Sequence, residues 1–484
     1  MRDIGIFNNA YLLNLFNLKE DDVQHICLRT ARDTLYADIT LRQKEHNCPI
    51  CDCKTSKVKD YTRKKILHSL TTHMPCYIMY RARRYICPAC SKSFYEHNPF
   101  SIRNMKISAL TVFNVLSDLK KPNETFSSVA SRYRISDTAV TYIFDAHISV
   151  SRRILPEYIC IDEVYAVTNQ DSEYVCILVD FLTGNVIDIL PSRKKLDLLT
   201  YFRSIPRSER EKVKIVCMDM WNTYRLVVKD IFPNACSAID KFHIYQEYTR
   251  LLTDVRIRAM NFVKPKALGN NPSVDEKYEH AKKDKQYYLL KKFNWLLTIN
   301  AYTTIQKVDK YSGEKKEYDY FDSNNEKKFN KKLNEYCNYE DLLNKILNID
   351  KDLEEMYNFK FELDTFFKKA NYDTSKEDVT SLITLCKNSE IKELKSFHNT
   401  LVNWKNEICN SLIKIKTHDD KYTYINNGKI ERKNRTIKSL KDQSNGFRNF
   451  RRFRQRVLYV MNEDATFSIN PVISKKAKSK RESD

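Results

Sequence analysis

The chain has 484 residues, of which 42% are hydrophobic and 30% charged, and its formal net charge is +21. This length exceeds one ordinary core, so about three domains are expected, and the excess of Lys and Arg favours a polyanionic partner, most simply nucleic acid. Because no run approaches ~18 uncharged apolar residues, the composition excludes a membrane-spanning helix, and the short apolar start "MRDIGIFNNAYLLNLF" does not fit a signal peptide.

Regularly spaced cysteines mark the N-terminal quarter of the chain. Residues 1–40 read as mixed helix and strand without recognisable chemistry, and residues 41–100 contain two paired turns, Cys48-Pro-Ile-Cys51 and Cys87-Pro-Ala-Cys90. In a reducing cytoplasmic compartment such spacing indicates metal before disulfide. Two such turns place four thiolates tetrahedrally around Zn²⁺, so a zinc ribbon-like module is predicted with Cys48, Cys51, Cys87 and Cys90 as ligands.

Two alternatives accompany this prediction. The turns could be redox or chance Cys-x-x-Cys pairs, and Cys53 and Cys76 are spare thiols that compete for ligand assignment. The bases Arg83 and Arg84 beside the second turn suit contact with DNA phosphates, although they could equally form a solvated edge.

Residues 101–150 read as helical. The stretch "TFSSVASRYRISDTAVTYIFDAHI" predicts a short helix over 127–133, a break near Arg134-Ile135, and a second helix capped by Ser136. Apolar residues fall where a helix-turn-helix packs its two helices. The second helix would then face the major groove of DNA through Asp137, Thr138, Thr141 and Tyr142.

The segment 155–255 has a different pattern. Three β-rich runs, "YICIDEVYAV", "YVCILVDFL" and "NVIDILPS", precede a helix, a strand, a second helix and a fifth strand. A three-stranded meander followed by alternating helices and strands predicts an RNase H-like α/β domain. Residues 256–420, with Leu and Phe at helical spacing, predict a long, mainly helical insertion. Residues 421–462 return the chain to the α/β domain, and 463–484 form a basic tail.

Two aspartates end predicted strands of this α/β domain. Asp162 ends the first strand and Asp219 the fourth, and these strands are neighbours in an RNase H-like sheet. Close carboxylates repel each other, a divalent cation relieves the repulsion, and oxygen ligands with open positions suit Mg²⁺ or Mn²⁺. Glu431, on a helix that starts near Asn426-Asn427-Gly428, is the predicted third ligand. Weaker candidates are Glu163 and Asp180.

Glu431 is a single acid among bases in "INNGKIERKNRTIK". At helical spacing Asn434, Arg435 and Lys438 share its face. We expect the acid to bind the cation, while Lys429, Arg435 and Lys438 hold the phosphates. Two metal ions about 3.5–4 Å apart would stabilise both oxygens of an in-line phosphoryl displacement. The alternative is that each acid is an ordinary surface or capping residue.

Several stretches together resemble the ISL-three family of bacterial insertion-sequence transposases: "CPIC", "CPAC", "ICIDEVYA", "VCMDMWNTYRLVVKDIFPNACSAIDKFHIYQEYTRLLTDVR" and "NNGKIERKNRTIKSLKDQSNGFRNFRRFRQRV". The resemblance covers most of the chain in the order zinc finger, helix-turn-helix and DDE catalytic domain with a helical insertion. It implies a cytoplasmic, nucleoid-associated transposase that acts with Mg²⁺ on terminal inverted repeats and target double-stranded DNA, as a homodimer or larger. Its catalytic residues would be Asp162, Asp219 and Glu431.

In related transposases the last carboxylate lies in a Y-(2)-R-(3)-E-(6)-K pattern. Tyr424, Asn427, Glu431 and Lys438 fit this spacing with Asn in place of Arg, and Arg432 stands where a small residue is expected. The resemblance also implies residues that support the DNA end or the wall of the active site. With the helix neighbour of Glu431, the expected supporting residues are Trp221, Asp240, His243 and Asn434.

Two other functions remain open from the sequence. One is a DNA-binding protein derived from a transposase without catalysis, against which the intact acid triad argues. The other is a metal-dependent nuclease of the same fold, which would cut DNA without joining it to a target.

Overall fold

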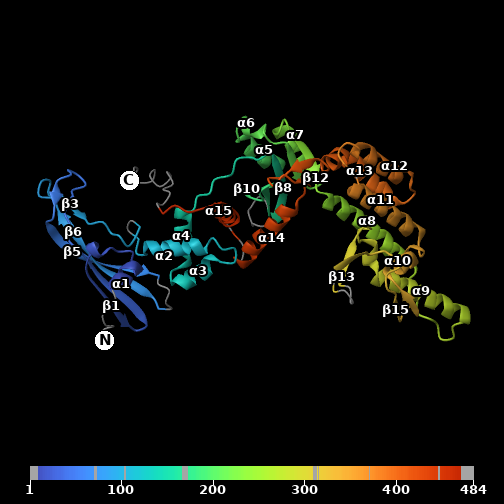
Figure 1. Cartoon of the computed structure of the whole chain (residues 1–484), viewed down its shortest axis with the longest axis horizontal. Helices are drawn as coiled ribbons and strands as arrows, with labels where there is room; N and C mark the ends of the chain where they lie inside the picture. The colour runs from blue at the N-terminus through green and yellow to red at the C-terminus, as the bar shows by residue number, and fades with distance from the viewer. Residues whose placement is uncertain are drawn as a thin grey trace.

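The computed structural model describes residues 9–69, 74–102, 105–165, 173–308, 313, 315–369, 371–444, 447 and 449–469. The described chain is elongated: a β-rich N-terminal part leads through a small helical bundle to a central sheet, beyond which lies a mostly helical part (Figure 1). In the described residues, no helix is both long enough and apolar enough to cross a membrane. Most of the predicted basic tail, from residue 470 onward, lies outside the described residues.

A five-stranded sheet forms the N-terminal part. The elements are α1 (Asn9–Leu15), η1 (Glu20–Asp22), β1 (Val23–Ala31), β2 (Thr34–Leu41), β3 (His46–Asn47), β4 (Lys54–Thr55), β5 (Val58–His68), β6 (Cys76–Ile86) and β7 (Ser93–Tyr95). The order is β1-β2-β6-β5, with β7 beside β6. Every second residue of β2 is buried, as expected of a sheet with one face on a core. That core includes Leu13 and Phe16, at and just beyond the end of α1.

Three short helices follow: α2 (Ala109–Asp118), α3 (Phe126–Tyr133) and α4 (Asp137–His147). The predicted break is confirmed, because α3 ends at Arg134 in the left-handed region (φ 54°). The predicted cap is also confirmed, since the Ser136 hydroxyl accepts a hydrogen bond from the Ala139 amide at 3.1 Å. The apolar residues at the contact between the two helices form the core of the bundle: Val129, Ala130, Val140 and Ile143 are buried, and Ile135 packs against them.

The central sheet contains all the strands predicted for it. Its elements are β8 (Tyr158–Tyr165), β9 (Tyr174–Asp180), β10 (Val186–Leu190), α5 (Lys195–Arg203), α6 (Arg207–Arg210), β11 (Ile215–Met218), α7 (Asn222–Ile231) and β12 (Cys236–Ile239). The strand order is β10-β9-β8-β11-β12. The meander β8–β9–β10 is antiparallel, and β11 runs parallel to both β8 and β12. Gly184 makes the β9–β10 turn with a φ of +75°, which favours glycine.

Helices cover both faces of the central sheet. On one face α5 and α7 bury residues such as Phe202 and Val227. On the other lie α14 (Gly428–Gln443) and α15 (Phe450–Met461), which bury Ile430, Ile437 and Val457. The hairpin of β17 (Lys414–Lys416) and β18 (Tyr422–Tyr424) leads into α14. The chain therefore returns to the sheet after the helical part, as predicted.

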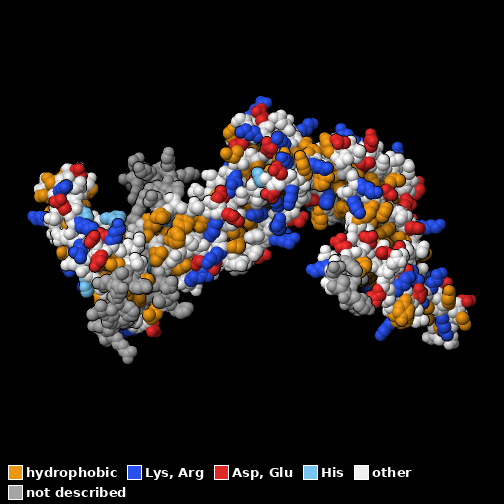
Figure 2. All heavy atoms as spheres, in the orientation of Figure 1, with side chains coloured by type: hydrophobic (Ala, Val, Ile, Leu, Met, Phe, Trp, Pro, Cys, Tyr) orange, Lys and Arg blue, Asp and Glu red, His pale blue; other side chains and the backbone are white. Residues whose placement is uncertain are grey.

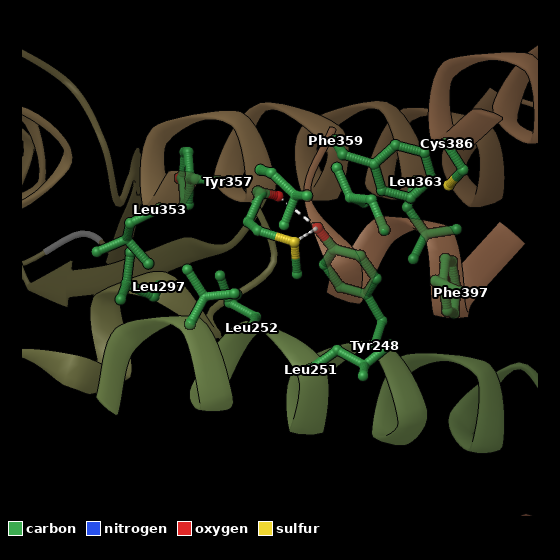
Figure 3. Close-up of a cluster of buried hydrophobic side chains, with 14 of the residues drawn as sticks. Tyr248, Leu251, Leu252, Leu297, Leu353, Tyr357, Phe359, Leu363, Cys386 and Phe397 are labelled. Carbon is green, nitrogen blue, oxygen red and sulfur yellow. Dashed lines mark hydrogen bonds between the residues drawn. The ribbon is translucent and has the colours of Figure 1, made fainter. Parts of the chain in front are cut away.

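The helical part has its own core. Its elements are α8 (Lys241–Phe262), α9 (Val274–Lys292), η2 (Asn294–Leu297), β13 (Thr304–Val308), β14 (Lys315–Asp319), β15 (Lys328–Asn330), β16 (Glu335–Cys337), α10 (Tyr339–Leu347), α11 (Lys351–Lys369), α12 (Ser375–Asn388) and α13 (Lys392–Asn410). Tyr248 and Leu252 of α8 face Leu353 and Leu363 of α11 (Figure 3). The Tyr248 hydroxyl donates to the backbone oxygen of Met356.

Two features of this part differ from the sequence prediction. The boundary placed between residues 255 and 256 is wrong, because it falls inside α8, which runs unbroken from Lys241 to Phe262. No Gly or Pro interrupts that stretch, so nothing ends the helix there. The pairs β13–β14 and β15–β16 were not predicted; the region is nevertheless mainly helical.

Candidate active site and zinc module

The four predicted zinc ligands come together at one end of the N-terminal sheet. The Sγ atoms of Cys48, Cys51, Cys87 and Cys90 all lie within 4.8 Å of one another. Cys48 Sγ is 3.6 Å from Cys90 Sγ, and Cys51 Sγ is 3.5 Å from Cys87 Sγ. A set of four thiols from two turns is the usual ligand set of a structural zinc site.

The two turns have matching backbone geometry. The Asp52 amide donates to Cys48 O at 2.9 Å, and the Ser91 amide donates to Cys87 O at 3.0 Å. Asp52 and Ser91 both adopt a left-handed φ, of 58° and 56°. In the second turn, the backbone amide of Cys90 lowers the pKa of Cys87 to about 6, which favours the thiolate that binds metal.

The two spare thiols are not part of this set. Cys76 is buried in the core of the N-terminal sheet, where burial raises its pKa to about 12. Cys53 donates weakly to Lys54 O. Of the described cysteines, the four predicted ligands alone form the cluster.

The prediction that Arg83 contacts DNA is contradicted by its burial. Its side chain is 4% exposed and pairs with Glu96, and its Nη2 donates to Leu41 O at 2.7 Å. Glu96 lies beyond the second Cys turn, and the chain folds it back over β6, so Arg83 is enclosed. Arg84 is partly exposed, and its Nε donates to Asp60 Oδ1 at 2.9 Å.

The exposed face of α4 carries the residues predicted to face DNA. Tyr142 is 64% exposed, Thr138 is exposed, and Thr141 is half-buried. Further along the helix, Asp145 accepts hydrogen bonds from Arg452 of α15. The N-terminal two-thirds of this face is therefore open, and its C-terminal end is joined to α15.

Asp162 and Asp219 lie side by side on neighbouring parallel strands. Asp219 directly follows β11, as predicted, but the prediction that Asp162 ends its strand is wrong, because β8 continues to Tyr165. The register that pairs Cys217 with Cys160 places each aspartate two residues further along its strand. Oxygens of Asp162, Asp219 and Glu163 lie within 4.8 Å of one another. Burial, and then the charge of Asp219, raise the pKa of Asp162 to about 7. Two acids this close disfavour each other's charge.

Glu163 leaves the strand on the opposite side from Asp162, because successive side chains alternate, yet one of its oxygens still lies within 4.8 Å of both aspartates. Its carboxylate accepts hydrogen bonds from Arg193 Nη1 at 2.6 Å and from the Tyr224 hydroxyl at 2.9 Å. Glu163 therefore has its own partners. Asp180 likewise accepts from the Leu182 amide and the Thr183 hydroxyl in the β9–β10 turn.

Two asparagines of α14 hold the aspartates. Asn434 Nδ2 donates to Asp162 Oδ2 at 2.6 Å, and Asn427 Nδ2 donates to Asp219 Oδ1 at 3.1 Å. Both asparagines are buried, and the Oδ1 atom of each lacks a partner among the described residues. The helix therefore presents this face to the acid pair.

Glu431 lies between these asparagines, four residues after Asn427 and three before Asn434, which places it on the same helix face. Its side chain is half-buried, and it is not part of the cluster of close acids. In the part of the chain that the structure describes, no hydrogen bond or ion pair satisfies its carboxylate. Of the three predicted acids, Asp162 and Asp219 therefore lie close together, and Glu431 lies on the neighbouring face of α14.

Asp240 and His243 connect α8 to this site. Asp240 is buried; one oxygen accepts from the Phe242 amide at 2.9 Å and the other from the Asn427 amide at 2.5 Å. His243 Nε2 lies 2.6 Å from Asp219 Oδ1. Burial lowers the pKa of His243, but the hydrogen bond and charge of Asp219 outweigh it, so the pKa is raised.

The remaining predicted residues border the acids. The Trp221 amide donates to Asp219 O at 2.6 Å. On α14, Lys429 donates to the carbonyl of Leu182, whereas Arg435 and Lys438 are exposed. Figure 2 shows Lys and Arg side chains gathered over the central part of this face, where Figure 1 places α14 and α15.

Sequence reasoning missed two residues of the site. Asn427 was placed only by the family spacing, as a replacement for Arg, yet it bonds Asp219. Arg193 bonds Glu163 and had no sequence signal, because it lies in a short segment between β10 and α5 rather than in a motif.

Comparison with known proteins agrees with this architecture. A family model described as a transposase, of the ISL3 DDE type, matches residues 159–457. A second, described as the zinc-finger of transposase IS204/IS1001/IS1096/IS1165, matches residues 44–90. The transposase for insertion sequence element IS1001 of Bordetella parapertussis is 28% identical over 106 residues, a segment that covers 22% of this chain and 26% of that relative. Because the first match spans more than half of the chain, the protein belongs to the ISL3 (ISL-three) family of transposases.

Proposed function

We propose that this protein cleaves DNA at the terminal inverted repeats of its insertion sequence and joins the ends to target DNA, with Mg²⁺ or Mn²⁺. The observation that carries the proposal is the pairing of Asp162 and Asp219 within 4.8 Å beneath the helix that bears Glu431. Carboxylate oxygens suit these hard cations. The raised pKa of Asp162 reflects its burial first and then the charge of Asp219, and a bound cation would offset both.

The surrounding residues fit such a site. A bound divalent ion would neutralise charge on the attacking and leaving oxygens of an in-line phosphoryl transfer. His243 and Asn427 hold Asp219, and Asn434 holds Asp162. Glu431, as the proposed third ligand, would reach the pair by turning its side chain from the same helix face. Arg435 and Lys438 would bind phosphates beside it.

Other parts of the molecule would bind the DNA. The strand order β10-β9-β8-β11-β12 supports the RNase H-like topology. The α3–α4 pair with its capped second helix supports a helix-turn-helix that faces the major groove through Thr138, Thr141 and Tyr142. Arg84 and the zinc module would add phosphate contacts. Assembly as a homodimer or larger on paired ends is part of the proposal.

The test uses purified protein, DNA carrying the inverted repeats that flank its gene, a target plasmid and Mg²⁺. We expect end DNA joined to the plasmid. Asp162→Asn and Glu431→Gln should each lower cleavage and joining by about 100-fold or more, while Asp230→Asn, an exposed acid on α7, should leave both unchanged. DNA binding without breakage, or an unaffected Asp162→Asn, would indicate a DNA-binding protein; breakage without joining would indicate a nuclease.

A further inference from the structure

Five aromatic and basic side chains form a continuous row beside the two aspartates. We call it the aromatic–basic row, and its members are, in spatial order, Lys441, Tyr165, Tyr174, Arg193 and Trp221. They come from five separate segments: α14, β8, β9, the β10–α5 connection and the start of α7. A surface built by that many segments is a product of the fold rather than of local sequence.

The distances show that each member contacts the next. Lys441 Nζ lies 4.0 Å from the centroid of the Tyr165 ring. The rings of Tyr165 and Tyr174 meet edge to face, with centroids 5.6 Å apart. Arg193 Cζ lies 4.3 Å from the Tyr174 ring and 5.1 Å from the Trp221 ring.

The aromatic–basic row is attached to the acid site at two points. Arg193 bonds Glu163, the residue that follows Asp162, and the amide of Trp221 donates to Asp219 O. Tyr165 lies two residues beyond Glu163 on the same face of β8, about 7 Å along the strand. A DNA strand whose scissile phosphate lies at the aspartates would therefore extend along this row.

The exposure of the rings indicates the chemistry of the ligand. Tyr165 is 41% exposed and Tyr174 is 37% exposed, which leaves much aromatic area in water. Exposed rings flanked by cations suit a ligand that carries planar groups beside negative charges. Unpaired nucleotides have this form, since their bases stack on aromatic rings and their phosphates pair with Lys and Arg.

We propose that the aromatic–basic row binds unpaired nucleotides of the DNA strand next to the reacting phosphate. Tyr165 and Tyr174 stack with the bases, and Arg193 and Lys441 contact the phosphates. This inference rests on the proposed function for its choice of DNA. A fully paired duplex hides its base faces, so it binds the row weakly.

The test compares two labelled duplexes of about 20 base pairs, one blunt and one with a single-stranded extension of about six nucleotides containing 2-aminopurine. Binding is measured without added Mg²⁺, so that the result does not depend on DNA cleavage. The zinc remains bound to the protein. The full-length protein should bind the extended duplex about 5- to 100-fold more tightly, the range expected from base stacking. The fluorescence of the 2-aminopurine in the extended duplex should be quenched on binding.

Three variants isolate the row. The double variant Tyr165→Leu/Tyr174→Leu should lose both the preference and the quenching while keeping its affinity for the blunt duplex. Tyr165→Phe/Tyr174→Phe keeps the rings and should keep both. Tyr302→Leu removes a comparable cation–aromatic pair, with Lys368 Nζ 3.6 Å from the ring, in the helical part and should change neither.

The inference is overturned if the wild type binds both duplexes equally without quenching, or if the double Leu variant keeps the preference. Should that variant not fold, Tyr174→Leu alone is measured in the same way. A wild type that prefers the extended duplex but never cleaves DNA in Mg²⁺ contradicts the proposed function and leaves this inference standing. A wild type that cleaves and joins DNA without the preference overturns only the inference.

Discussion

At the scale of single residues, Asp162 is held where its charge is disfavoured. Burial and Asp219 raise its pKa to about 7 from an ordinary value of 3.8. Because the folded pKa exceeds the unfolded one, the folded state binds the extra proton between those values, and stability falls as the pH rises through that window. Above this pH window, the ionised carboxylate of Asp162 destabilises the folded state by on the order of 2–4 kcal/mol.

Asp162→Asn should remove this destabilisation. At about pH 8 without Mg²⁺ the variant should unfold at a higher temperature than the wild type, and the difference should shrink towards about pH 4. Added Mg²⁺ should raise the unfolding temperature of the wild type but not of the variant, because ligands stabilise the state that binds them. Scanning calorimetry measures these unfolding temperatures at each pH, with and without Mg²⁺. A wild type more stable than Asp162→Asn at the higher pH without Mg²⁺ would contradict the prediction.

Asn434 donates a hydrogen bond to Asp162 and would act on the proposed metal site by orienting that carboxylate. Asn434→Ala should weaken Mg²⁺ binding about 10- to 100-fold, as is usual when a residue behind a metal ligand is removed. Titration calorimetry measures the affinity, and Asn399→Ala, on the exposed face of α13, serves as the control. An unchanged affinity in a folded Asn434→Ala variant would show that Asp162 does not depend on this bond.

At the scale of elements, the sequence was most informative where patterns are local. The strands of the central sheet are apolar runs bounded by turn residues, and the α3–α4 break has a capping Ser136. The hairpins of residues 304–337 are short and rich in Lys and Asn, so no alternation marks them. Arg83 was misplaced for another reason: its burial depends on Glu96 and the Leu41 carbonyl, which are distant in sequence and give no local signal.

In the candidate site, too, residues with a local sequence signal could be predicted and residues placed by long-range contacts could not. Asp219 and the four cysteines could be predicted, because each follows a strand or lies in a recognisable turn. Asp162 could be predicted because it lies in a recognisable apolar strand, although that strand is longer than expected. The bond from Asp240 to the Asn427 amide joins residues 187 positions apart, and the register of α14 on the sheet follows from it. Only the folded core of the helical part brings those ends together.

The two Cys turns should fold around zinc as one unit. Cys87→Ser should release bound zinc, because it removes one of four clustered ligands, and it should weaken binding of end DNA while the central sheet stays folded. Elemental analysis measures the zinc. Cys53→Ser is the matched control, since Cys53 lies beside the first turn outside the cluster and should retain one zinc ion. Wild-type protein without zinc would contradict the assignment.

At the scale of the whole molecule, α15 joins the helical bundle to the central sheet (Figure 1). One side of the helix packs on the sheet through Val457, and the other reaches the bundle through Tyr459. Arg456 is 1% exposed, and its Nη2 donates to Lys121 O at 3.1 Å and to Glu124 O at 2.6 Å. Arg456 is therefore a structural link between the bundle and the helix that packs on the sheet.

Breaking that link should separate the bundle from the central sheet without unfolding either. Under the proposed function, the link would set how far DNA bound at α4 lies from the acids. Arg456→Leu leaves two carbonyls without a donor, which should cost about 2–3 kcal/mol locally. Hydrogen exchange should then become faster in α2–α4 and stay unchanged in β8 and β11. Arg451→Leu, at an exposed position of the same helix, should alter neither. Uniformly faster exchange across the sheet would instead show that Arg456 belongs to one global core. Unchanged exchange in α2–α4 would show that the packing of the bundle on α15 does not need Arg456.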